Sequence, residues 1–425
     1  MKGLTKDDFV LYDDGKKQNI AVFETNARRV SPDAGKPSQA LPPNEFTNRP
    51  LGGQAEEGNA ILVVWDMLNT SFVDQIRARP AVLKSLSVIH PGDHVGIYIL
   101  GTSIGVLQDL TSDSAQLVAA MDKYAKWPDI GYLPPPQKDS MLRQAEWEIG
   151  NHLARVPGRK SVICISSGGP RLLYGAGFAI YPVDARGLPG FPEIRAEQSA
   201  APDYDNAPWG PHSRDREAMR LAAESTGGAF ATWTNDIRGA IDSAMTDADV
   251  TYTLGFYAEA PAPREKPYRE LKVQVKRSGV DIRYRKSYPT IPYTPPPERL
   301  IADAVASAID STQLVISARL EKDGSALRIP ITVDSADLVL AENNGRRSGI
   351  LDLVLVQRSA DGAEMDRLSR SVELNVERPR YDEFLKQGFR GTFTMDPKPG
   401  LAEIKVVVLD RTSKRVGSLT MAASH

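Results

Sequence analysis

Two histidines, His90 and His94, come closest to a metal-binding spacing in this chain. Histidines four residues apart can bind one ion from the same face of a helix. Pro91, Gly92 and Asp93 stand between them, however, and a proline inside a helix breaks it. We therefore expect both histidines in a loop before a strand, with no metal. The remaining histidines are His152, expected on the solvent side of a helix, His212 and His425.

The sequence offers no recognisable catalytic group. Residues 166–169 (SSGG) follow an apolar run but lack the G-x-S-x-G frame of a nucleophile elbow. Residues 66–70 contain no glycine, which argues against a phosphate-binding loop and a dinucleotide cofactor. Asp184 and Arg186 are expected to form a salt bridge that fixes the turn after a strand. We predict no catalytic residue, no cofactor and no enzyme; the alternative is a hydrolase or transferase with an unrecognised active site.

The composition is typical of a soluble globular protein. Hydrophobic residues make up 41% and charged residues 25%, with a net charge of -2, so the totals do not favour a nucleic-acid partner. The single cysteine, Cys164, lies in an apolar run and is expected to be buried and inert. No segment approaches the ~20 apolar residues of a membrane span. We also expect no signal peptide in these first residues, because no apolar stretch follows Lys2.

Apolar periodicity and turn residues divide the chain into domains. With 425 residues, it is long enough for two. The predicted parts are an N-terminal β-hairpin at 1–30, a linker at 31–58, an α/β domain at 59–290, a proline-rich linker at 291–297 and an all-β sandwich domain at 298–425.

The hairpin is predicted from residues 9–12 and 20–23, two β-rich runs around an Asp-Gly turn. A lone hairpin is marginal in water, so we expect it to dock on another domain. After residue 297, seven short strands with turns between them indicate a β-sandwich.

Strand and helix patterns alternate in the middle of the chain. The expected strands are 60–66, 94–100, 160–166, 178–183 and 250–257, and residues 271–275 should pair with 280–284. Repeated β-α-β units predict a mostly parallel sheet with helices on both faces. The helix over 70–89 contains Pro80, which should kink it or begin a second helix. Between 168 and 177 we expect at most a single helical turn.

Five phrases of the sequence, taken in order, resemble a family. Together they are similar to the VWFA-related branch of von Willebrand factor A (vWA) proteins, a bacterial branch first noticed in acidobacteria. The resemblance covers roughly residues 3–290 and implies a Rossmann-like vWA domain. It also implies an exported, extracytoplasmic protein, whose hairpin would belong to a larger β unit truncated at Met1. The phrases are GLTKDDF at 3–9, WDMLNT at 65–70, VPGRK at 156–160, YPVDARGL at 181–188 and VTYTLGFY at 250–257.

The resemblance raises the question of a metal-ion-dependent adhesion site. In the family, Asp-x-Ser-x-Ser after the first strand, a later Thr and an Asp after the fourth strand hold Mg²⁺ with oxygen ligands. Asp66 and Thr70 match the first and last places of the triplet, but Leu68 replaces the first Ser. Ser167 stands where the family has the second carboxylate. Asp139 or Ser140 could lie near the place of the missing Thr, and Asp139 and Asp184 are the ligands that this alignment could have missed.

Such a degenerate site would hold Mg²⁺ only weakly, and we favour an edge without metal. Asp66 and Thr70 would then cap the first helix and satisfy loop amides. The predicted function is therefore that of a non-catalytic binding, scaffold or adhesion protein. Its partner would be a protein or another macromolecule that the sequence does not identify. The predicted partner-binding edge consists of Asp66, Leu68, Asn69, Thr70 and Ser167.

Overall fold

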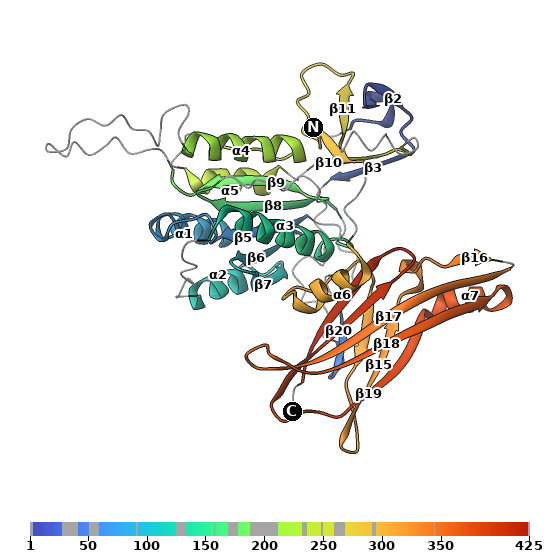
Figure 1. Ribbon diagram of the computed structural model, residues 1–425. Coiled ribbons are helices and arrows are strands. Elements are labelled where there is room, and N and C mark those ends of the chain that lie inside the picture. The colour runs from blue at the N-terminus through green and yellow to red at the C-terminus, as the bar shows by residue number, and fades with distance from the viewer. Residues whose placement is uncertain are drawn as a thin grey trace. The chain divides into compact units, whose positions relative to one another are not determined.

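The chain forms two compact units in a computed structural model (Figure 1). The first unit comprises residues 1–36, 56–147 and 157–292, and the second comprises 37–55, 148–156 and 293–425. Part of the expected first linker thus belongs to the second unit. The residues that the structure describes are 3–27, 41–50, 59–90, 92–124, 133–156, 158–168, 177–187, 211–231, 236–247, 250–258, 268–290, 295–343 and 345–423.

The first unit is built on a five-stranded central sheet in the order β7-β6-β5-β8-β9. β5 (Ala60–Asp66) pairs in parallel with β6 (His94–Leu100) and β8 (Lys160–Ser166), and β9 (Ala179–Asp184) continues the parallel set. Only β7 (Ile104–Thr111), at one edge, is antiparallel. Every residue of β5 is buried, as its unbroken apolar run predicts for a strand covered on both faces. This confirms the α/β class.

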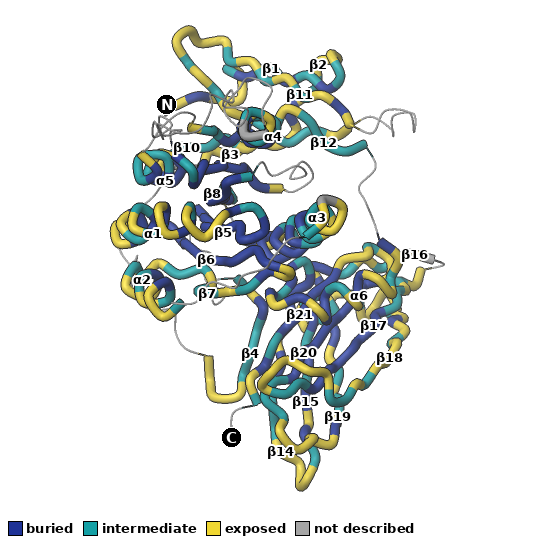
Figure 2. The backbone as a smooth tube through the Cα atoms, turned by 60° about the vertical axis from the view of Figure 1, so that its left-hand side comes forward, coloured by how far each residue is buried: buried dark blue, intermediate teal, exposed yellow. Residues whose placement is uncertain are grey.

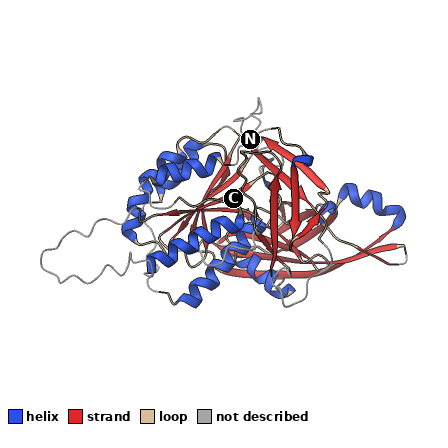
Figure 3. Cartoon of the chain, turned by 90° about the horizontal axis from the view of Figure 1, so that it is seen from above, coloured by secondary structure: helices blue, strands red, loops and turns tan. Residues whose placement is uncertain are grey.

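Helices cover both faces of this sheet (Figure 2, Figure 3). α1 (Phe72–Leu86), α2 (Ser114–Lys123) and α5 (Ile237–Thr246) lie on one face, and α3 (Pro135–His152) lies on the other. α4 (Pro211–Thr226) packs against β9. Among the described helices, none is both long and apolar enough to cross a membrane.

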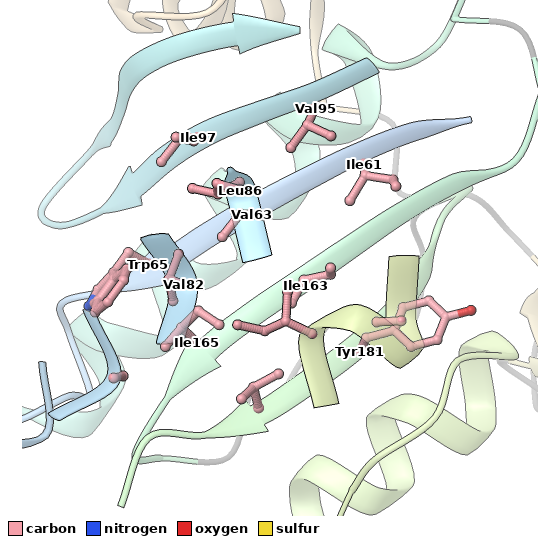
Figure 4. Packing of buried hydrophobic residues seen from close by; sticks show 14 of the residues in the cluster. Ile61, Val63, Trp65, Val82, Leu86, Val95, Ile97, Ile163, Ile165 and Tyr181 are labelled. Carbon is pink, nitrogen blue, oxygen red and sulfur yellow. The ribbon is translucent and has the colours of Figure 1, made fainter. Parts of the chain in front are cut away.

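The main core lies under α1. Val82 and Leu86 of this helix point toward Val63 and Trp65 of β5, and all four are buried (Figure 4). Because Val82 and Leu86 are four residues apart along α1, they lie on one apolar stripe of the helix. α1 runs through Pro80 as one helix, so the expected second helix does not begin there.

One expected strand of the central sheet belongs elsewhere. β10 (Val250–Gly255) pairs antiparallel with β3 (Val22–Ala27), in a separate two-stranded sheet. Its residues alternate between apolar and polar, and none is fully buried. That alternation is typical of a half-exposed antiparallel strand, whereas a central parallel strand is apolar throughout. The prediction for 250–257 was wrong for this reason.

The N-terminal hairpin is shorter than expected. β1 (Phe9–Asp13) pairs with β2 (Lys16–Gln18) through a turn in which Asp14 and Gly15 have φ of 50° and 78°. Two positive φ values fit the tight Asp-Gly hairpin turn. The second strand was therefore misplaced at 20–23.

The hairpin also has partners far along the chain. On its other side β1 pairs with β11 (Tyr268–Val275), which pairs with β12 (Ser287–Pro289). The expected pairing of 271–275 with 280–284 was wrong, since 280–284 is not a strand. All these strands belong to the first unit, so the hairpin is part of the unit that holds the α/β sheet.

A buried ion pair fastens this β layer. Asp13 is fully buried, and Arg269 donates to it from Nε at 3.0 Å and from Nη2 at 2.7 Å. The Tyr288 hydroxyl donates a third bond at 3.1 Å. Thus a residue of β1 is joined to residues of β11 and β12.

The second unit contains two five-stranded antiparallel sheets that share one hydrophobic cluster. The seven strands expected after residue 297 are all present, and α6 (Pro297–Ala306) and α7 (Arg378–Gln387) accompany them. One sheet contains β4 (Glu45–Thr47), β13 (Ile316–Arg319), β14 (Glu321–Asp323), β15 (Ala326–Val333) and β19 (Phe389–Met395). The other contains β16 (Ala341–Asn343), β17 (Arg346–Ser359), β18 (Glu364–Glu377), β20 (Leu401–Asp410) and β21 (Arg415–Ala422).

Two features of this unit differ from the sequence-based expectations. β4 comes from the expected linker, and Asn48 beside it bonds the backbone of Ser311, Leu314 and Ile316. β4 was missed because three residues are too few to show the alternation of apolar and polar side chains that marks a strand in the sequence. His152 was expected in solvent but is buried, with Nδ1 2.8 Å from the carbonyl oxygen of Asp310. The expectation for the segment 168–177 lies mostly outside the described residues.

Candidate functional site

Asp66 ends β5 at the carboxyl edge of the central sheet and is fully buried. Its Oδ1 accepts bonds from the backbone N–H groups of Leu68 (3.0 Å) and Asn69 (3.2 Å). Its Oδ2 accepts from the Asn69 side chain (2.8 Å) and from the Ser166 hydroxyl (2.7 Å). Each carboxylate oxygen thus has two protein donors, and the loop after β5 is folded around Asp66.

Burial dominates the electrostatics here. It raises the pKa of Asp66 above its ordinary value, although the bonds from Asn69, Ser166 and Leu68 act in the opposite direction. Burial, followed by the nearby Asp66 charge, also raises the pKa of the Cys164 thiol far above its usual range. A buried thiol of this kind is not a nucleophile at neutral pH, in keeping with the inert role expected for it.

The loop after β8 is joined to the start of α1. The backbone N–H of Ser167 donates to the Thr70 hydroxyl at 3.3 Å, and the Ser167 hydroxyl donates to Asp74 at 2.9 Å. Asp74 also accepts from Ser71, whose hydroxyl caps the helix by accepting from the Asp74 N–H. The helix cap is therefore Ser71, and the prediction that Asp66 and Thr70 cap this helix was wrong. Asp66 does satisfy loop amides, as predicted.

Two residues of this site were missed in the sequence. Asp74 had a usable signal, since Ser71 followed three residues later by an acidic residue resembles a capping box. Lys138, in the first turn of α3, donates from Nζ to the carbonyl oxygen of Leu68 at 2.6 Å. No local pattern could indicate this contact, because the two residues are 70 positions apart. The sequence placed Asp139 or Ser140 near this edge, and the neighbouring lysine makes the contact.

Asp184, at the end of β9, is held by two guanidinium groups. Arg186 donates from Nε at 2.8 Å and from Nη2 at 3.0 Å, and Arg216 donates from Nε at 2.9 Å. The predicted salt bridge between Asp184 and Arg186 is confirmed. Arg216 comes from α4 and also reaches the carbonyl oxygen of Gly187, so this turn is fixed from two sides.

These side chains do not suit a divalent cation. Mg²⁺ needs free oxygen ligands, and both oxygens of Asp66 are engaged by protein donors. The Thr70 hydroxyl accepts from the backbone N–H of Ser167, and the Ser167 hydroxyl donates to Asp74. The described residues hold no cluster of three or more His, Cys, Asp or Glu that could bind an ion. We therefore derive no chemistry from a metal at this edge.

Exposed apolar side chains lie directly beside the loop. Phe72, Val73 and Ile76 of α1 are 64%, 63% and 56% exposed. They lie on the side of the helix away from the buried stripe of Ala78 and Val82. We call these three residues the α1 patch. The sequence carried a signal for it, because they fall outside the i, i+4 stripe that a helix of a globular protein buries.

Comparisons with known proteins do not assign a family. No protein-family model matches the chain, and no curated protein matches it. One similar solved structure is a von Willebrand factor type A protein from Catenulispora acidiphila (11% identity, 96% of this chain and 73% of that chain, TM-score 0.29). A second is VWA2, the ArnB paralogue of Sulfolobus acidocaldarius (9% identity, 98% and 74%, TM-score 0.27). A third is an aerotolerance-related membrane protein from Bacteroides fragilis (14% identity, 45% and 100%, TM-score 0.30). At such TM-scores the similarity carries no argument, and the fold rests on the strand order given above.

Proposed function

We propose that this chain is a non-catalytic binding or scaffold protein that holds another macromolecule at the carboxyl edge of its central sheet, without a metal ion. The observation that carries the proposal is the α1 patch. Contiguous apolar side chains that are more than half exposed are costly in water and mark interaction sites in soluble proteins. Phe72 supplies an aromatic anchor of the kind enriched in the centres of interfaces.

The edge around the α1 patch is already ordered for binding. Asp66, Ser167 and Lys138 hold the loops of β5 and β8 and the start of α3 by hydrogen bonds of 2.6–3.3 Å. A partner would therefore meet a surface whose backbone conformation is fixed, which lowers the entropy cost of association.

We further propose that the first unit is a vWA domain of the exported bacterial branch and that the second is a β-sandwich. Five sequence phrases and the parallel order β6-β5-β8-β9 support the first assignment. The two sheets with a common core support the second. We propose an extracytoplasmic location from the resemblance alone. Fractionation of cells that express the natural gene tests it.

Photocrosslinking tests the binding proposal directly. A photoreactive amino acid replaces Val73 in the α1 patch or, as a control, Val88, which is 66% exposed just beyond the end of α1. We expect a discrete crosslinked partner from position 73 and none from position 88 when the protein is illuminated with the envelope of its native cells. Equal labelling at both positions, or none at 73, would contradict the proposal.

Paired substitutions make the test quantitative. Phe72→Ser with Ile76→Ser should reduce crosslinking from position 73 at least about tenfold, because truncating central apolar anchors typically costs 2 kcal/mol or more. Val88→Ser should leave it unchanged. Since all three side chains are exposed, their loss should alter folding stability by about 0.5 kcal/mol or less.

A further inference from the structure

β19 is an edge strand of the second unit. It pairs with β15 over its whole length, from Phe389 opposite Val333 to Met395 opposite Leu327. Within the described residues, no strand pairs with its other side. An unpaired edge presents a row of backbone N–H and C=O groups that can bind another strand.

This edge lacks the usual protection. β18, the edge strand of the other sheet, pairs only with β17 among the described strands, but six of its 14 residues are charged. Charges of this kind prevent edge-to-edge association. β19 reads FRGTFTM, with Arg390 as its single charge and no proline. α7 precedes β19 but packs against β18 and the short helix η3 (Ser335–Asp337).

The two faces of β19 differ in character. Arg390, Thr392 and Thr394 are exposed, whereas Phe393 on the opposite face is half-buried. Gly391 lies between aromatic rings, and a Cβ there would stand 3.0 Å from ring atoms of both Phe389 and Phe393. Its own phenyl rings therefore already fill the space beside Gly391, and the exposed face of the strand carries Arg390, Thr392 and Thr394.

We propose that the outer edge of β19 pairs antiparallel with β19 of a second copy of this chain, around a twofold axis at Thr392. This register pairs all seven residues of the strand. It sets Arg390 opposite Thr394 of the second copy, so the two arginines do not face each other. It also sets Phe393 opposite Gly391 of the second copy, so the two Phe393 rings do not stand directly opposite each other. The self-complementary register is why a second copy is the occupant that this edge fits.

The predicted dimer is weak and follows mass action. One strand pair buries less surface than a stable interface needs, so the dimer should appear only as concentration rises. Sedimentation velocity of the full chain over about a hundredfold range of concentration should show a monomer–dimer equilibrium. Monomer at every concentration would overturn the proposal.

Three substitutions locate the interface. Thr392→Lys places two ammonium groups against each other on the axis and should abolish the dimer. Thr394→Glu places a carboxylate opposite Arg390 and should strengthen it about two- to fivefold. Ser369→Lys, on the exposed face of β18, should change nothing. Loss of the dimer with Ser369→Lys but not with Thr392→Lys would overturn the proposal, and the gain from Thr394→Glu tests it even if Thr392→Lys folds poorly.

Disulfide trapping gives an independent readout. Directly opposed residues of an antiparallel pair have Cα atoms about 4.5–5.5 Å apart, which a disulfide can span. Mild oxidation should therefore link Thr392→Cys into covalent dimers. Thr394→Cys should remain monomeric, since it lies about four residues from its own copy along the pair, more than 10 Å away. The native Cys164 is buried and does not compete. Equal crosslinking of both variants would refute the register.

Discussion

Replacing Asp66 by alanine should destabilise the first unit by about 2–4 kcal/mol, because buried donors lose their acceptor. The bond from the Leu68 N–H to Asp66 is buried, and that from the Asn69 N–H is partly buried. An unsatisfied buried donor costs about 1–3 kcal/mol. Ser166 loses less, since its hydroxyl also lies 2.7 Å from the carbonyl oxygen of Gly168. We therefore expect the perturbation to be structural and independent of a bound ion.

The isosteric variant Asp66→Asn adds a pH dependence with a definite sign. Burial raises the folded pKa of this carboxyl above its ordinary value of 3.8, so the folded chain holds the proton more tightly than the unfolded chain. The resulting stabilisation is complete below the ordinary pKa and is lost as pH rises through the folded one. Wild-type stability relative to Asp66→Asn should thus be greatest in acid and should fall toward neutral pH.

Urea denaturation with hydrogen exchange at residues 60–70 measures both effects, with Mg²⁺ and with EDTA. We expect EDTA to leave the wild-type midpoint unchanged, and each variant to keep its difference in stability from the wild type in either buffer. If EDTA instead lowers the wild type to the level of Asp66→Ala, Asp66 is a metal ligand and the argument from hydrogen bonds fails. A cost below about 0.5 kcal/mol for Asp66→Ala would refute it as well.

Three other predictions follow from features described above. Calorimetric titration of the unaltered chain should show no Mg²⁺, Mn²⁺ or Ca²⁺ binding tighter than millimolar, and Leu68→Ser with Ser167→Asp should strengthen it by restoring an oxygen and a carboxylate. Arg269→Ala should cost about 3–5 kcal/mol in urea denaturation, because a fully buried carboxylate of β1 loses its counter-charge. Gly228→Ala should prevent soluble expression, since its Cβ would overlap a backbone carbonyl oxygen of β9, whereas Gly105→Ala, with its nearest neighbour 3.9 Å away, should fold normally.

The buried strands could be predicted because their own residues are apolar enough to indicate burial. β5 and β8 contain the apolar runs 60–65 and 162–165, which are typical of strands covered on both faces. β10 failed for the opposite reason, since a strand after a helix suggested a fifth parallel strand although its alternation fitted an antiparallel pair. His152 failed because a histidine on a helix is placed by what packs over it, here a carbonyl group 158 positions away.

The position of these loop residues was predictable, but their burial was not. Asp66, Leu68, Thr70 and Ser167 are buried, so they do not form the exposed partner-binding edge that the sequence predicted. Asp66, Thr70 and Ser167 were expected at one edge, and the structure brings them together there. Their roles depend on residues that reach the edge from elsewhere, above all Lys138. The α1 patch, in contrast, could have been found from the helical period.

Pairing the N-terminal strands with residues near 250–275 has a consequence for biosynthesis. β1 pairs with β11, and β3 pairs with β10. Each of these N-terminal strands can complete its pairing only after a strand near the end of the first unit has been translated. At 5–20 residues per second, the ribosome needs about 10–50 s to cover that interval. Until then Phe9, Leu11 and Phe23 lack the apolar partners that the later segment supplies, among them Tyr252, Leu271 and Val273. The β layer of the first unit therefore forms only after both ends of that unit have been synthesised. A nascent chain released early would expose the apolar residues of β1 and β3 to chaperones and proteases.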